Sequence, residues 1–288
     1  MTLHVGVSVH DSLMVADPAA RARLLADVVD AGLDHVTLGD HVSFHGGTGF
    51  DGLLSATAVL ATNSSIQVLL GVYQLALRHP MLTARQLSSL AQLAPGRLTL
   101  GVGVGGEDRL EISNCGVDPA SRGRRLDETL HVLRQLSTGD TIDHHGEFFD
   151  LDQAAVLPAP TPPAPVVIGG SGDVAVRRTV AHGDGWLAIF TTGRRFAETR
   201  GQILDAAAES GRDIDWFGIS VWCGFGPDEQ QARSVLGPTM QTLYQLPPEK
   251  FGHLTGAGTP EQVAAYLSPY VEAGATNISV IPVEPSPA

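Results

Sequence analysis

The sequence predicts an α/β fold, a closed (β/α)8 TIM barrel with insertions after its fourth and seventh strands. Short apolar, β-branched runs bounded by Gly, Pro or Asp recur along the 288 residues, and the first four begin near positions 3, 35, 66 and 97. Successive steps of 31 to 32 residues equal one strand–helix–strand unit each. Parallel strands need such crossovers, and a closed barrel hides both edges of the sheet. An open doubly wound sheet is the alternative.

The apolar runs give eight predicted strands. They are Leu3–Val9, His35–Leu38, Ile66–Gly71, Arg97–Val102, Pro165–Ile168, Gly185–Ile189, Phe217–Cys223 and Asn277–Ile281. Helical spacing of leucines and valines, together with start signals such as Asp17-Pro18 and the capping-box pattern Thr259-Pro260-Glu261-Gln262, predicts helices between them. These are Pro18–Ala31, Thr83–Leu93, Ser121–Leu136, Val174–His182 and Glu261–Glu272.

The second half of the chain is less regular than the first. Residues 104–120 are expected to form a loop after the fourth strand, and residues 139–164 a hairpin with a proline-rich linker. Residues 225–258 contain four prolines and are expected to form a further insertion. The whole chain, 1–288, is interpreted as one barrel domain.

Composition and charge narrow the function. The formal charge of −13 argues against non-specific binding to nucleic acid or to an anionic membrane. Cys115 and Cys223 suit neither a disulfide framework nor a metal site, and the amino-terminal residues lack the pattern of a signal peptide. No apolar stretch approaches the length of a membrane helix. A cytoplasmic protein with a small-molecule substrate is expected.

In a barrel, chemistry lies at the carboxyl ends of the strands. The second strand ends at Asp40-His41, the best acid–base candidate, because a strand end holds it rigidly and histidine titrates near neutral pH. The structural alternative is that Asp40 caps a turn and His41 is only partly exposed. His10, after the first strand, is a weaker pocket candidate. No spacing of ligands predicts a metal site.

Two glycine-rich turns suggest a bound cofactor. Gly169-Gly170-Ser171-Gly172 follows the fifth strand and opens a helix, where free amides and the Ser171 hydroxyl could hold a phosphate. An ordinary turn without a ligand is the alternative. Gly101 to Gly106 matches a dinucleotide fingerprint poorly, since a loop follows in place of a helix. A flat surface for a planar ring suits this run better.

Taken together, motifs in the expected order along nearly the whole chain resemble the luciferase-like monooxygenase superfamily. The matching segments are Ala31–Asp34 with Gly39–His41, Leu70–Val72 with Arg78–Pro80, Ala94–Gly103, Arg122–Glu128, Pro165–Gly172, Asp184–Trp186 and Gly258–Val263. The resemblance implies a barrel that binds FMN or the deazaflavin coenzyme F-420, and a homodimer. It also implies a non-prolyl cis peptide in a bulge of the third strand, at Gly71–Val72, against which the ring rests.

The same resemblance implies which residues contact each part of the cofactor. Gly169, Gly170, Ser171 and Gly172 would contact the phosphate, and Gly103, Val104 and Gly105 would line the ring or the ribityl chain. Asp40 and His41 match the pair of the F-420-dependent branch, in which the histidine exchanges a proton or orients the substrate. The spacing of Glu107 departs by one residue from the position expected for a pocket glutamate, which puts a catalytic role for Glu107 in doubt.

The resemblance leaves three functions open. The favoured one is hydride transfer between reduced F-420 and a small organic substrate, with His41 delivering the proton. The second is an FMN-dependent monooxygenase that uses externally reduced flavin and oxygen, and the third a non-catalytic flavin-binding relative. Lys250 is the only lysine, so a sugar phosphate bound by lysines is a poor substrate guess. An apolar lining of the substrate pocket is suggested by Phe44, Phe50, Trp222, Phe225 and Tyr244.

Overall fold

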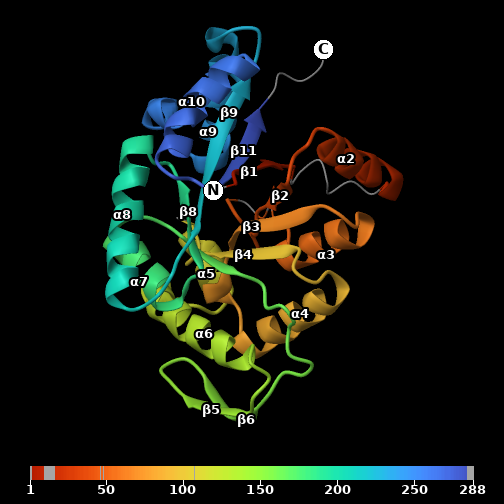
Figure 1. The fold of residues 1–288 in the computed structure, drawn as a ribbon, viewed down its shortest axis with the longest axis vertical. Coiled ribbons are helices and arrows are strands. Elements are labelled where there is room, and N and C mark those ends of the chain that lie inside the picture. Colours follow the sequence, from red (N-terminus) through yellow and green to blue (C-terminus); the bar gives the residue numbers. More distant parts are fainter. Residues whose placement is uncertain (1, 10–16, 46, 48, 107, 284–288) are drawn as a thin grey trace.

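Eight parallel strands close into a barrel (Figure 1). The computed structural model describes residues 2–9, 17–45, 47, 49–106 and 108–283. Each barrel strand pairs with the next in a fixed order, and the last pairs back with the first. The order is β1 (His4–Ser8), β2 (His35–Leu38), β3 (Gln67–Tyr73), β4 (Leu98–Val102), β7 (Val166–Gly169), β8 (Gly185–Ile189), β9 (Trp216–Phe225) and β11 (Asn277–Val283).

The pairing of β8 with β9 closes the sheet and excludes the open, doubly wound alternative. Each predicted strand coincides with a barrel strand, with ends that differ by no more than two residues. The barrel and its strand assignment are therefore confirmed. The 31-residue period was informative because each strand must be followed by a crossover before the next parallel strand can pair.

Helices cover the outside of the barrel. They are α2 (Pro18–Asp30), α3 (Gly52–Thr62), α4 (Pro80–Leu93), α6 (Arg122–Leu136), α7 (Gly172–His182), α8 (Gly193–Glu209) and α10 (Pro260–Glu272). The start signals work as expected: the Asp17 carboxylate accepts from the Ala19 amide, and Thr259 and Gln262 form a complete capping box.

Two segments expected to be irregular contain helices. The predicted loop 104–120 holds α5 (Arg109–Asn114), whose first amides are capped by Asp108. The predicted insertion 225–258 holds α9 (Glu229–Tyr244), the 3₁₀ turns η2 (Pro248–Lys250) and η3 (Gly252–Leu254), and β10 (Gly256–Gly258). The prediction of an irregular insertion was wrong because it took the prolines as evidence against a helix. Pro238 lies inside α9, where burial of Leu236 and Met240 stabilises the helix despite the lost hydrogen bond.

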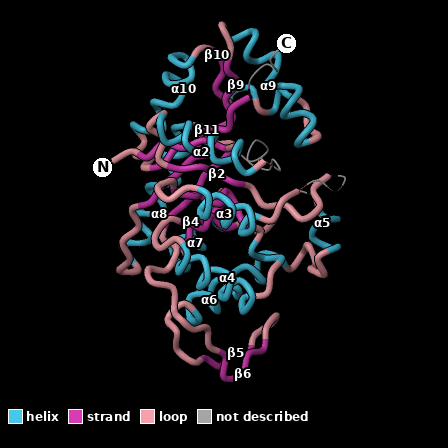
Figure 2. Tube along the Cα trace, turned by 90° about the vertical axis from the view of Figure 1, so that its right-hand side faces the viewer, coloured by secondary structure: helices cyan, strands magenta, loops and turns pink. Residues whose placement is uncertain are grey.

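The additions lie at opposite ends of the molecule (Figure 2). The hairpin expected in 139–164 is present as antiparallel β5 (Ile142–His145) and β6 (Asp150–Ala154) and projects at the lower end in Figure 2. The α9, β10 and α10 elements lie at the upper end, where β10 extends the sheet along β9. Among the described helices, none has the length and apolar composition of a membrane span.

Candidate functional site

The ends of β3, β4 and β7, neighbours in the barrel, meet at Val72. A β-carbon built on Gly103 would lie 2.7 Å from Val72 Cγ2, and one on Gly169 would lie 2.8 Å from Val72 Cγ1. Any side chain at either position would therefore collide with Val72. The three strand ends instead present two glycines and one isopropyl group, an apolar surface that we call the floor.

The floor contains the irregularity that the family resemblance implied. The Gly71–Val72 peptide is cis, and the register between β3 and β4 shifts between Leu70 and Tyr73. Both features of this expectation are confirmed. On the side of the barrel axis, a β-carbon on Gly71 would lie 2.9 Å from Thr37 Cγ2 of β2.

The turn from β7 into α7 borders the floor and is open to solvent. Gly170 and Gly172 have φ values of 115° and 71°, and Ser171 between them is the exposed N-cap of α7. The Ser171 side chain makes no capping hydrogen bond, so its hydroxyl is free to meet a ligand together with the first amides of the helix. The indole N–H of Trp186 donates to the Gly170 carbonyl at 2.9 Å and fixes the turn.

Asp40, at the end of β2, is a buried anchor. Its carboxylate is 0% exposed and accepts hydrogen bonds from Arg78 Nη2 (2.8 Å), the Gly52 amide (2.9 Å) and the Gln74 amide (2.8 Å). Burial raises the pKa of Asp40 above its usual value, while the Arg78 guanidinium and the two amides act in the opposite direction. Direct contact with a ligand, expected from the sequence, does not fit this placement, because no part of the carboxylate is accessible.

His41 is the partly exposed residue of the pair, with 36% of its side chain accessible. Its Nδ1 atom lies 3.1 Å from Glu111 Oε2 and 3.1 Å from Gln74 Nε2. No hydrogen bond to Nε2 is found among the described residues. The Phe44 ring packs on the imidazole at 4.2 Å between centroids, and it packs equally closely on His45 on its other side.

Glu111, in the first turn of α5, ties the segment after His41 to the barrel. Its side chain is 0% exposed, and its Oε1 atom accepts from the amides of Val42 (2.6 Å) and Ser43 (3.0 Å). Burial raises the pKa of Glu111, but the hydrogen bonds from Ser43, His41 and Val42, together with the charge interaction with His41, outweigh burial, so the pKa lies below its usual value. Glu111 is therefore an ionised carboxylate at neutral pH.

An aromatic cluster lies across the mouth from His41. In an eight-stranded ring, β8 is four places from β2 and faces it across the barrel. Phe190 follows β8 and packs against Tyr244 and Phe251, while the Trp222 indole of β9 donates to the Tyr244 hydroxyl at 3.1 Å. These contacts hold α9 and η2 over the ends of β8 and β9. Phe50, also expected in the lining, is 42% exposed.

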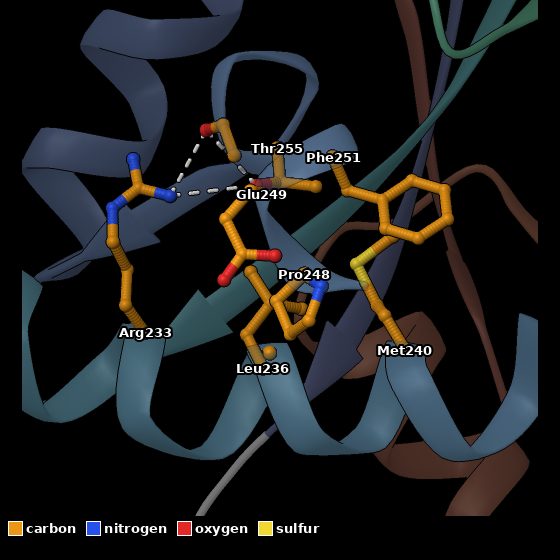
Figure 3. A pocket seen from close by; sticks show the side chains of 9 residues that line it. Arg233, Leu236, Met240, Pro248, Glu249, Phe251 and Thr255 are labelled. Atoms are coloured by element: carbon orange, nitrogen blue, oxygen red, sulfur yellow. Dashed lines mark hydrogen bonds between the residues drawn. The ribbon is translucent and has the colours of Figure 1, made fainter. Parts of the chain in front are cut away.

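A small cavity of about 230 Å³ lies between α9 and the 3₁₀ turns η2 and η3 (Figure 3). Leu236, Met240 and Phe251 form its apolar side, and Arg233 crosses one edge with hydrogen bonds to the Gly252 carbonyl and to Thr255 Oγ1.

The structure thus brings together most of the residues that the sequence singled out. Val104 and Gly105 follow Gly103 in the loop after β4. A β-carbon on Gly105 would lie 3.0 Å from Gln74 Oε1. His10 and Glu107 lie outside the described residues. The sequence reasoning missed three residues that organise the site, namely Gln74, Arg78 and Glu111. The signal for Glu111 was present, since Asp108 three residues before it is a helix-start pattern.

The fold is a (β/α)8 barrel with a bulged third strand, and glycines, Ser171 and His41 lie at or just after the carboxyl ends of its strands. The chain belongs to the luciferase-like monooxygenase family, whose model matches residues 2–255.

Two relatives show sequence similarity to this chain. An uncharacterised protein of Mycobacterium tuberculosis is 43% identical over 116 residues, which are only 40% of this chain and 40% of that protein. A protein of Beutenbergia cavernae named F-420-dependent glucose-6-phosphate dehydrogenase is 32% identical over 236 residues, 75% of this chain and 68% of its own.

Solved structures share the fold at lower identity. An F-420-dependent secondary alcohol dehydrogenase, in complex with an F-420–acetone adduct, superposes with a TM-score of 0.84 at 19% identity, over 99% of this chain and 95% of its own. The FMN-containing oxygenating constituent of a 3,6-diketocamphane monooxygenase from Pseudomonas putida reaches 0.74 at 14% identity, over 98% and 92%. Barrels of both cofactor types therefore share this fold.

Proposed function

We propose that the chain is an oxidoreductase that binds coenzyme F-420 at the barrel mouth and transfers a hydride between it and a small organic molecule. One observation carries the proposal: the apolar floor at Val72 lies on β3, next to β2, which ends three residues before His41. A planar redox ring on this floor would have a proton-exchanging side chain at its edge. The F-420-dependent names of relatives such as the Beutenbergia cavernae protein support the choice of cofactor.

The residues present fit such a cofactor at three points. The apolar floor of Val72, Gly103 and Gly169 suits a planar ring, because neither glycine carries a side chain and Val72 occupies the space that a β-carbon would take. The uncapped amides and hydroxyl at Ser171 suit a phosphate. Gln74 Oε1 is buried without a hydrogen-bond partner beside the Gly105 loop, and it supplies an acceptor for a polar ligand edge.

The mechanism divides the work between cofactor and protein. When bound, F-420 supplies the hydride chemistry. The protein orients the reactants: the floor sets the plane of the ring, and the Ser171 turn holds the tail. His41 moves the proton that accompanies the hydride, through its accessible imidazole. Asp40 serves as a positioning residue, since its buried contacts with Arg78 and the Gln74 amide fix the ends of β2 and β3 relative to each other.

Titration of the purified protein with each cofactor tests the proposal. F-420 fluorescence should change saturably, with an affinity at least about tenfold, or 1.4 kcal/mol, better than that for FMN. Saturable FMN binding without F-420 binding would instead favour the monooxygenase that the FMN-containing structural neighbour represents. His41→Asn should bind F-420 normally and lose about 100-fold or more in turnover. Normal F-420 turnover by this variant would remove the proton-transfer role.

We also propose that the protein acts in the cytoplasm as a homodimer. The free thiol of Cys115, which is partly exposed, suits a reducing compartment. Exposed apolar side chains at Leu54 and Leu110, on α3 and α5, offer surface that a second copy could cover. Light scattering should give twice the 30.2 kDa chain mass; a mass equal to one chain would refute the dimer.

A further inference from the structure

We propose that Glu111 is a positioning residue that keeps the proton of neutral His41 on Nδ1 and leaves Nε2 as the proton-accepting atom. The catalytic consequence rests on the function proposed above, whereas the tautomer itself does not. The observation behind it is that one buried carboxylate holds three consecutive residues: His41 through its ring, and Val42 and Ser43 through their amides.

The direction of the His41–Glu111 hydrogen bond follows from charge. Both oxygens of an ionised carboxylate are acceptors, so a hydrogen bond to Nδ1 requires Nδ1 to carry the proton. Glu111 has no exposed surface, and its two amide donors keep it ionised at neutral pH. A protonated Glu111 could donate to Nδ1 instead, but it would lose the charge that these amides stabilise.

Gln74, the other polar group at Nδ1, cannot replace Glu111 as the acceptor of the Nδ1 proton. Its amide nitrogen lies 2.8 Å from the Asp40 carbonyl and 3.1 Å from His41 Nδ1. Turning the amide over would place Gln74 Oε1 against the carbonyl oxygen of Asp40, two acceptors in contact. The nitrogen therefore stays toward Asp40. It could donate to Nδ1 only in the Nε2–H tautomer, which would place an unprotonated Nδ1 3.1 Å from the ionised Glu111 Oε2, two acceptors in contact. In the proposed tautomer Gln74 Nε2 donates to the Asp40 carbonyl alone, and Glu111 accepts from Nδ1–H.

The tautomer gives His41 a direction of action. Neutral His41 with a free Nε2 lone pair is a base, suited to the oxidation of an alcohol. In that reaction the carbinol C–H bond breaks and its electron pair leaves as hydride to the cofactor, while the O–H proton passes to Nε2 and a carbonyl group forms. In the reverse reaction the imidazolium returns the proton to the oxygen. On the function proposed above, this tautomer suits substrates that lose a hydride and an O–H proton together, as alcohols do.

The geometry of Glu111 predicts an unusual effect for its isosteric amide. Oε1 accepts from both backbone amides, while Oε2 is the atom nearer to Nδ1, at 3.1 Å against 3.3 Å. In Glu111→Gln the one remaining oxygen must stay with the two amides. The NH₂ group then takes the place of Oε2 and donates to Nδ1, which must become an acceptor. The proton of His41 moves to Nε2, so the variant inverts the tautomer.

Nitrogen-15 NMR of the imidazoles in the cofactor-free protein at neutral pH tests this directly. The His41 signals are assigned by their loss in His41→Gln. We expect an Nδ1–H tautomer in the wild type and an Nε2–H tautomer in Glu111→Gln. Glu229→Gln is the matched control, because Glu229 also lies in the first turn of a helix but is exposed and pairs with Arg233; this variant should keep the wild-type tautomer.

The proposal is overturned by an Nε2–H tautomer in the wild type. It is also overturned if Glu111→Gln and the wild type show the same tautomer. The wild-type spectrum alone decides should the variant not fold. With F-420 and an alcohol, Glu111→Gln should lower kcat about 100-fold with little change in KM. Absence of F-420 binding together with the expected tautomers would refute the proposed function and leave the positioning role of Glu111 intact.

Discussion

The strand that ends at the candidate proton-transfer residue begins with a second histidine in a very different environment. His35, the first residue of β2, lies inside the barrel with only 6% of its surface exposed. Its Nε2 atom is 3.0 Å from Ser279 Oγ, which in turn is 2.8 Å from Thr37 Oγ1. Burial lowers the pKa of His35 from 6.5 to about 4; Asp34 opposes this shift and His4 adds to it.

This shift makes stability depend on pH. In the unfolded chain His35 takes up a proton near pH 6.5, but in the folded protein only near pH 4. Between these values the unfolded state holds more protons, so lowering the pH favours unfolding. A difference of roughly 2.5 pH units at 1.36 kcal/mol per unit gives a loss of about 3 kcal/mol on going from neutral pH to pH 4.

Urea unfolding at several pH values between 7 and 4 measures this loss. Other groups also titrate in this range, so the quantity of interest is the difference between the wild type and His35→Gln, which can still hydrogen bond to Ser279. The variant should lose about 3 kcal/mol less than the wild type over this range. His253→Gln, at an exposed position in η3, should keep the wild-type slope. Equal slopes for His35→Gln and the wild type would refute the reasoning.

Three further substitutions probe the site. Gly103→Ala forces a β-carbon to 2.7 Å from a Val72 methyl group, so it should weaken F-420 binding at least about tenfold and lower the free energy of unfolding by about 1–3 kcal/mol. Gly39→Ala, with open space around its β-carbon, should change neither quantity. Asp40→Asn should lower the free energy of unfolding in urea by about 3 kcal/mol, because it leaves Arg78 without its buried partner. Asp51→Asn, at the more exposed partner of Arg78, should lower it by less than about 1 kcal/mol. An equally small loss for Asp40→Asn would contradict the anchoring role. Ser171→Ala should weaken F-420 binding by about 1–2 kcal/mol and leave the urea midpoint unchanged, since the hydroxyl caps nothing; a lower midpoint would show that it stabilises α7 instead.

The sequence predicted the barrel because its signals are local. Apolar runs of strand length, repeated at the spacing of one crossover, leave few ways to bury each strand. The caps at Asp17 and Thr259 were also local, since each side chain bonds to an amide two or three residues away. Prolines are a weaker local signal. Pro238 argued against a helix in its segment, but buried contacts of α9 with β9 outweighed that preference.

The candidate site was predictable only in part. Glycine runs and the Asp40-His41 pair can be read at the strand ends, but whether a carboxylate is exposed or enclosed depends on distant residues. Asp40 is enclosed by Arg78, 38 residues away, and His41 is held by Glu111, 70 residues away. Neither partner lies within the window that a motif covers.

By itself, the sequence determined the order of the barrel strands, five of the helices between them, the family, and the glycines around which an apolar floor could form, because each depends on spacing along the chain. Only the tertiary structure decided that Val72 fills the gap between Gly103 and Gly169, that Asp40 is buried while His41 is accessible, and that Glu111 is the carboxylate beside the imidazole. These are contacts between strand ends, and barrel closure alone brings such ends together.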